Sequence, residues 1–459
     1  MPRFAHQLNA ARVFPALIFF LVFLSLAGST ALFAEREIPY DAYISVLRYP
    51  DAATERAADQ RERNQFLARI LEQPLRPIGY GMGKTAEWVE RHHVEEKAVW
   101  FFDELASHGI HIKTKSPTEG SLGTLGLKGR VELEKLFKIE QPYVASEVFG
   151  AWAPNKGFDG STVELGGRYQ IDASEGVFFH EGLVRYDRSS AESFYGVGQN
   201  TSLGDLSTYK PERLKFGASF GYHLTPTMDG HGSLIYEKVN IGNGNRERVG
   251  KIKEHFTGIP GVNGGDLAGL LVSFLHDNRD SKSDTKRGGE EKIEFSYMHD
   301  TDGSDFQYLK LTGSVRRFFT IFSDRRVLAL RVLAEKNQEL GGDEIPFFNM
   351  SRLGGSDRSD GSELLRSYRY NRFFDEGLFL ANAEYRYSIY EYGNFGGDAF
   401  LLFDVGEVFE EIGSIGFEEL KFSGGGGFNV KFRRKTLFSF FVARGNEGWS
   451  SGAHTKISF

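Results

Sequence analysis

The chain has 459 residues and no cysteine, which excludes disulfides, thiol nucleophiles and cysteine metal sites. Its formal net charge is -7, so the charge balance gives no support for nucleic acid as a partner. The 54 glycines, 41 phenylalanines and 19 tyrosines, against 13 prolines, favour aromatic strands joined by glycine turns.

Residues 1–34 are predicted to be a secretory signal peptide. Arg3 and Arg12 precede the apolar run VFPALIFFLVFLSLAG, and small residues ending in STALFA follow it. The run is shorter than the roughly 18 residues expected of a membrane-spanning helix, which favours a cleaved signal over a retained anchor. We therefore expect the mature chain to leave the cytoplasm.

Residues 35–121 are predicted to form a short helical periplasmic segment, because glutamate, arginine and alanine are frequent and apolar residues recur at helical spacing. The stretch GYGMGKT within it resembles a phosphate-binding loop. Only three residues separate Gly79 from Gly83, however, where such a loop has four. His92 and Glu96 lie four apart without a third ligand. Neither a nucleotide nor a metal ion is expected here.

Residues 122–459 change to a period of two, which is typical of strands with two different faces. The stretch LKFSGGGGFNVKF, for example, places Phe422 and Phe428 on one face and Ser423 and Lys431 on the other. We predict an all-β fold, a transmembrane antiparallel β-barrel of about sixteen strands with a polar lumen. A soluble sandwich also alternates, but aromatic residues that recur near strand ends favour a membrane interface.

Motifs that would carry metal or catalytic chemistry are incomplete. The stretch DTDGSD, residues 300–305, has its glycine fourth, whereas a calcium loop has it sixth, and the Asp-Gly pair predicts a hairpin turn. The 12 histidines are scattered rather than gathered near a serine. We expect no catalytic residue, no metal, no cofactor and no enzyme activity.

The C-terminal third contains four motifs in a distinctive order, MSRLGG, LLRSYRYNRF, LANAEYRYSIY and AFLLFDVGEVF. Their order resembles that of the BamA/TamA family of outer-membrane proteins, also called bacterial surface antigens. In that family a long loop folds back into the barrel, and the arginine of a Val-Arg-Gly-Phe/Tyr motif meets carboxylates on the inner wall. The resemblance implies that Arg366 is this arginine and Tyr368 the aromatic residue. Leu365 and Ser367 replace the valine and the glycine.

Two carboxylates are expected opposite this arginine. Strand phase alone directs Glu384 into the lumen, and it directs Asp404 there together with Gly406. A buried arginine between two acids gains charge-assisted bonds. Together with the resemblance, this predicts a clasp between the loop and the barrel wall. The terminal Phe459 matches the aromatic end of an outer-membrane barrel.

The resemblance implies an outer-membrane location in a Gram-negative-type bacterium and a role in protein assembly, insertion, or translocation of polypeptide or lipid. The partners it implies are outer-membrane lipid and client or periplasmic proteins, with no nucleic acid and no nucleotide. The periplasmic POTRA modules usual in that family are not evident before Leu122. A passive porin-like channel or a structural outer-membrane protein remains the alternative.

Overall fold

The computed structural model describes the barrel and little of what precedes it. The signal peptide, most of the segment 35–121 and Phe459 lie outside the described residues. The described residues are 104–105, 107–108, 110–115, 126–137, 144–153, 162–173, 178–356, 363–392, 395–416, 419–432 and 435–454.

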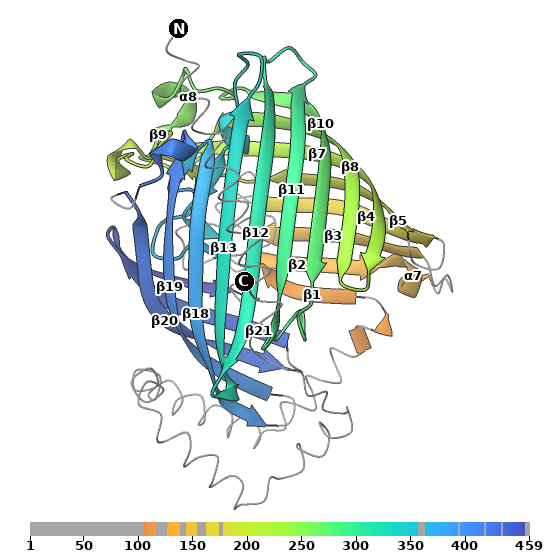
Figure 1. Cartoon of the computed structure of the whole chain (residues 1–459). Helices are drawn as coiled ribbons and strands as arrows, with labels where there is room; N and C mark the ends of the chain where they lie inside the picture. Colours follow the sequence, from red (N-terminus) through yellow and green to blue (C-terminus); the bar gives the residue numbers. More distant parts are fainter. Residues whose placement is uncertain are drawn as a thin grey trace, which may run out of the picture.

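One antiparallel sheet forms the barrel wall (Figure 1). Of its 18 strands, β6 (Glu192–Phe194) and β9 (Gly250–Lys251) are short additions beside β7. Each of the other sixteen, up to β21, pairs with the one that follows it in chain order, so the predicted β-barrel fold and its strand number are confirmed. They are β1 (Ile110–Lys115), β2 (Gly126–Glu132), β3 (Val144–Ala153), β4 (Thr162–Ala173), β5 (Phe178–Arg188), β7 (Ser207–Thr225), β8 (Met228–Asn243), β10 (Gly264–Asp277), β11 (Gly288–Asp300), β12 (Gln307–Ile321), β13 (Ser323–Glu339), β18 (Gly377–Tyr392), β19 (Phe395–Phe409), β20 (Lys421–Phe432), β21 (Lys435–Gly445) and β22 (Gly448–His454).

The sheet begins earlier than the sequence predicts. Strand β1 lies before Leu122, inside the stretch predicted to be helical, and pairs with β2 from Ile110↔Val131 to Lys115↔Gly126. Its sequence IHIKTK alternates apolar and polar residues, but six residues are too few to outweigh the helical pattern before them. Helical backbone is present just before it, at Glu104, Leu105 and Ser107.

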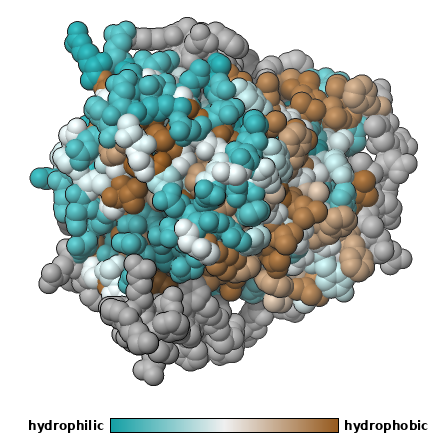
Figure 2. Space-filling model, turned by 90° about the horizontal axis from the view of Figure 1, so that it is seen from above, coloured by the Kyte–Doolittle hydropathy of each residue, from teal (hydrophilic) through white to brown (hydrophobic). Residues whose placement is uncertain are grey.

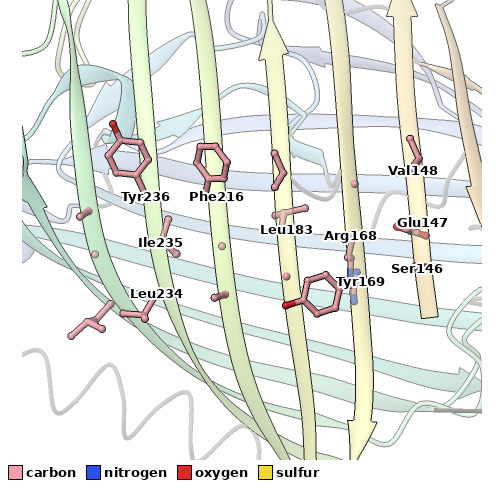
Figure 3. Close-up of a pocket in the computed structure, with 18 of the residues that line it drawn as sticks. Ser146, Glu147, Val148, Arg168, Tyr169, Leu183, Phe216, Leu234, Ile235 and Tyr236 are labelled. Atoms are coloured by element: carbon pink, nitrogen blue, oxygen red, sulfur yellow. The ribbon is translucent and has the colours of Figure 1, made fainter. Parts of the chain in front are cut away.

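The outer wall of the barrel is apolar. Figure 3 shows Tyr169, Leu183, Phe216 and Leu234 on the successive strands β4, β5, β7 and β8, where they line one shallow groove. Tyr169, Phe216 and Leu234 are 40%, 42% and 58% exposed. Figure 2, seen from above, shows a largely hydrophilic end face and hydrophobic residues gathered along one flank. This distribution fits a wall that faces lipid and ends that face water.

Connections alternate between short turns and long loops. Strands β7 and β8 are joined by residues 226–227, and β12 and β13 by Phe322 alone. The connection 340–376 between β13 and β18 is long and holds its own short elements. In outer-membrane barrels the short turns face the periplasm and the long loops face outward.

The helices and the remaining strands are short and lie in these connections. No helix among the described residues is long and apolar enough to cross a membrane. The elements are α7 (Leu133–Leu136), η4 (Leu203–Asp205), α8 (Ile252–His255), η5 (Phe347–Asn349), β14 (Ser351–Leu353), β15 (Gly355–Ser356), β16 (Glu363–Leu365), β17 (Phe373–Asp375) and η6 (Ile412–Ser414).

A run of four glycines, 424–427, lets strand β20 pass close to its neighbours. A Cβ atom at Gly425 would lie 2.1 Å from the Val442 carbonyl oxygen, and one at Gly427 would lie 2.0 Å from that of Phe440. Both contacts are shorter than any side chain allows. This part of the wall therefore requires glycine.

An apolar core fills the barrel near its long-loop end. Side chains of β7, β8, β10, β11 and β12 pack there against residues of the connections, and Phe194, Ile252 and Phe347 are fully buried. Phe347 belongs to the connection 340–376, so this loop closes over the lumen rather than projecting into solvent.

We expect the purified protein to migrate faster on an unheated gel than after boiling, because a closed barrel resists detergent until heat separates its strands. The measurement is gel mobility of outer-membrane fractions with and without heating. Recovery in the soluble periplasmic fraction, with no heat-dependent shift, would contradict the barrel assignment.

Candidate functional site

The connection 340–376, here called the lumen loop, packs against the inner wall. Within it β14 pairs with β17, and β15 pairs with β16. Apolar residues of these small hairpins join lumen-facing residues of β13, β18 and β19 in one buried cluster. Its members are Leu333, Leu353, Leu364, Leu365, Tyr368, Phe373, Leu378, Leu380 and Val408.

Arg366 follows β16 directly and binds Asp404 of β19 in a two-pronged contact. Its Nε and Nη2 atoms donate to the two carboxylate oxygens of Asp404 at 3.0 and 2.5 Å, and its backbone N–H donates at 3.1 Å. Asn382 adds a fourth hydrogen bond to Asp404, at 2.9 Å. Both charged side chains are 0% exposed. The two parallel hydrogen bonds of the guanidinium thus fix the orientation of the loop, in addition to the attraction between the two charges.

The same guanidinium reaches Glu384 of β18 through Nη1. Arg386, two residues further along β18, donates to the other oxygen of Glu384 at 2.8 Å. Two arginines therefore face two carboxylates in a site closed to solvent. Such a cluster is favourable only while every member keeps its partner, because each charge has lost its hydration.

The loop turns sharply beside this cluster. The Tyr368 N–H donates to the Leu365 carbonyl at 3.1 Å, which closes a tight turn, and Ser367 adopts it without a positive φ angle. The Ser367 hydroxyl lies 2.6 Å from the hydroxyl of Ser423 on β20. Serine at the position of the family's glycine thus adds a wall contact.

Two wall glycines leave room for the loop. A Cβ atom at Gly406 would lie 3.3 Å from the Leu353 side chain, and one at Gly445 would lie 2.2 Å from the Ser367 hydroxyl oxygen. Gly406 lies in the predicted lumen phase. Its contribution is the absence of a side chain where the loop lies against the wall.

The lumen loop also contacts elements other than β18 and β19. Asn371 donates to Glu192 of β6 at 3.3 Å, and Arg372 donates to Thr201 at 2.7 Å and to Glu447 in the β21–β22 turn at 2.8 Å. Asn371 has a φ of 55°, a conformation asparagine tolerates better than most residues. The loop is therefore bound on several sides.

Comparison with known proteins agrees with this architecture. A model of the Omp85 superfamily domain matches residues 154–450. The chain belongs to the Omp85 superfamily. Members of this superfamily are outer-membrane barrels of Gram-negative bacteria, and this chain is one of them.

Two solved structures show the same fold as this Omp85 chain. BamA from Haemophilus ducreyi lacking POTRA domains 1–3 is 12% identical, with a TM-score of 0.53 over 76% of this chain and 70% of that one. CdiB from Escherichia coli is 10% identical, with a TM-score of 0.51 over 75% of this chain and 62% of that one. The chain thus spans less than two thirds of CdiB. No curated protein matches the sequence significantly.

A second buried ion cluster lies at the short-turn end of the Omp85 barrel. Lys431 of β20 contacts Asp284 at 2.6 Å and also Asp398 of β19, and all three residues are less than a tenth exposed. Asp284 belongs to the turn between β10 and β11, far around the wall from β20. The alternation of residues along β20 placed Lys431 in the lumen. Turn residues follow no such alternation, so the sequence did not reveal that Asp284 is the partner of Lys431.

The remaining sequence motifs contribute no site among the described residues. No group of three or more His, Cys, Asp or Glu residues in this part of the chain is placed to hold a metal ion. The segment GWSSG, residues 448–452, has the spacing of a nucleophile elbow but runs straight along β22, where such an elbow needs a strand–turn–helix. His92 and Glu96 lie outside the described residues.

We expect Arg366→Ala to release the lumen loop, because it leaves Asp404 buried with only Asn382 as a side-chain partner. The cost is about 3 to 5 kcal/mol. Glu384→Gln should cost less, because Asp404 still balances Arg366 and an amide oxygen can still accept a hydrogen bond. The measurements are protease cleavage between Gly354 and Asp375 on intact cells, and the unfolding temperature.

The matched control is Arg287→Ala, which removes an arginine from an ion pair whose two side chains are 63% and 62% exposed. Exposed pairs contribute little, so this variant should behave as the parent. Equal, parent-like behaviour of Arg366→Ala and Glu384→Gln would show that the lumen loop is held by other contacts.

Lys431→Met should free the turn 278–287, because it leaves Asp284 and Asp398 buried without their cation, again at about 3 to 5 kcal/mol. Asp284→Asn should be milder, since Lys431 keeps Asp398. A broad-specificity protease added to outer-membrane fragments should cleave this turn faster in Lys431→Met. Lys282→Met, at a side chain 84% exposed, is the control, and cleavage equal to it would refute a restraining role for Lys431.

Proposed function

We propose that this Omp85 barrel moves polypeptide into or across the outer membrane, and that release of the lumen loop is the step that opens the path. The observation that carries the proposal is the Arg366 cluster, which holds the lumen loop against the barrel wall through ion pairs and hydrogen bonds rather than covalent bonds. Membership of the Omp85 superfamily and the fold shared with BamA and CdiB support an assembly or translocation role.

The two ends of the sheet offer a second support. The first and last described strands, β1 and β22, pair with β2 and β21 respectively. A strand edge whose N–H and C=O groups face no partner can accept another strand. A client strand could therefore enter the wall at this seam once the loop has moved.

A passive channel is less well supported, because the described lumen contains the loop and the apolar core beneath it. Water would need a continuous polar path.

Because the chain has no cysteine, the lumen loop can be locked by one engineered disulfide. The Ser367 and Ser423 hydroxyl oxygens lie 2.6 Å apart, near the roughly 2.05 Å of a disulfide bond, so Ser367→Cys with Ser423→Cys should cross-link. In proteoliposomes, the oxidised double variant should lose acceleration of the folding of an unfolded outer-membrane barrel protein. A reductant should restore it.

The two single-cysteine variants are the controls and should match the parent under both conditions. Full activity of the oxidised double variant would show that loop release is not required. A parent protein that neither accelerates folding nor carries polypeptide into the liposomes, yet conducts ions steadily, would favour the passive channel instead.

A further inference from the structure

A cavity of 420 Å³ lies at the long-loop end of β19, beyond Gly406, the last residue of that strand paired to β20. Three separate connections meet there: the one before β7, the lumen loop, and the one between β19 and β20. Its lining residues are Val197, Gly198, Gln199, Asn200, Thr201, Asp375, Glu407, Val408, Phe409, Glu410, Ser414 and Glu419.

The charged residues that line this cavity are all acidic. Four carboxylates line it, those of Asp375, Glu407, Glu410 and Glu419, and no lysine, arginine or histidine does so among the described residues. Asn200 donates to both oxygens of Glu419 at 3.3 Å. The cavity thus holds more acceptors than donors.

Glu407 is the member that most needs a further donor. It is 2% exposed, and its Oε1 atom is buried without a hydrogen-bond partner. The Gly416 N–H hydrogen-bonds the same carboxyl group, so the missing donor concerns one oxygen. Leaving a buried carboxylate oxygen unpaired is costly, and the cost disappears when a bound cation supplies the donor.

Asp375 belongs to the lumen loop, outside the membrane-spanning strands. It too lacks a positively charged partner among the described residues that line the cavity. Burial, together with the negative charges of Glu376 and Glu410, raises its pKa to about 6. Near neutral pH the carboxylate is therefore charged at an energetic cost. A cation in the cavity would offset that cost.

The nearest cations are bound elsewhere. Lys336 contacts the Glu376 carboxylate and donates to the Glu410 carbonyl oxygen at 2.7 Å. Arg372 is held by Thr201 and Glu447. Neither lines the cavity, and Lys336, whose charge lowers the pKa of Asp375, offsets only part of the negative charge of the four acids.

We propose that this cavity binds an organic cation, the ammonium or guanidinium group of a lysine- or arginine-like ligand, at the cell surface. Its volume is far larger than a single bare ion requires. The described acids also do not form a group placed to hold a metal ion. Three connections meet at the cavity, so the bound cation would join them through charge-assisted hydrogen bonds. The proposal does not depend on the proposed transport function.

The test is isothermal titration of the full chain in nanodiscs with two probes, a tetralysine peptide and spermidine. Both should bind, and Glu407→Gln should weaken binding at least tenfold, because the amide removes one negative charge and one charge-assisted hydrogen bond. Glu254→Gln removes one exposed acid of another long loop and should leave binding unchanged. Retained heat-modifiable migration shows that each variant is folded.

Should Glu407→Gln fail to fold, Glu410→Gln at the exposed rim gives the same comparison. Tighter binding of tetralysine than of spermidine identifies a polypeptide side chain as the ligand, and the reverse order identifies a free polyamine. Equal binding by Glu407→Gln, Glu410→Gln and Glu254→Gln overturns the proposal. So does binding of neither probe, or Glu407-dependent binding of calcium alone.

Discussion

One buried ion cluster joins the lumen loop to the barrel wall, and in it Arg366 and Arg386 face Glu384 and Asp404 without contact with solvent. The energetics of such a cluster are asymmetric. Its complete form offers little more stability than packed apolar residues would, whereas loss of one member leaves a buried charge without its main partner. The cluster therefore favours the fully inserted loop over a partly inserted one.

The second cluster, around Lys431, applies the same principle at the other end of the barrel. It joins a turn that follows β10 to strands β19 and β20, so a connection is held against the wall there too. The two clusters share no residue, but both use the inner face of β19, through Asp404 in the first and Asp398 in the second. Movement of this strand would therefore affect both restraints together.

The alternation of residues along the strands predicted most of the fold and the inward-facing wall residues. A period of two indicated the barrel and directed Glu384, Asp404 and Lys431 inward, and family resemblance supplied Arg366. The start of the sheet at Ile110 was missed because a six-residue strand follows a longer helical pattern. Asp284 and the acidic cavity were missed for another reason. Their residues lie in turns and loops, where contacts depend on how distant connections meet in space.

The four glycines of β20 have a consequence for the shape of the barrel. Where a side chain would collide with the next strand, the sheet can bend more sharply than a regular pleat allows, and glycines at such places form corners in closed sheets. Ser423, which contacts the lumen loop, immediately precedes this corner. The glycines therefore permit tighter curvature of the wall on the side that holds the loop. Because glycine restricts the backbone least, we expect this stretch to bend more easily than the rest of the wall.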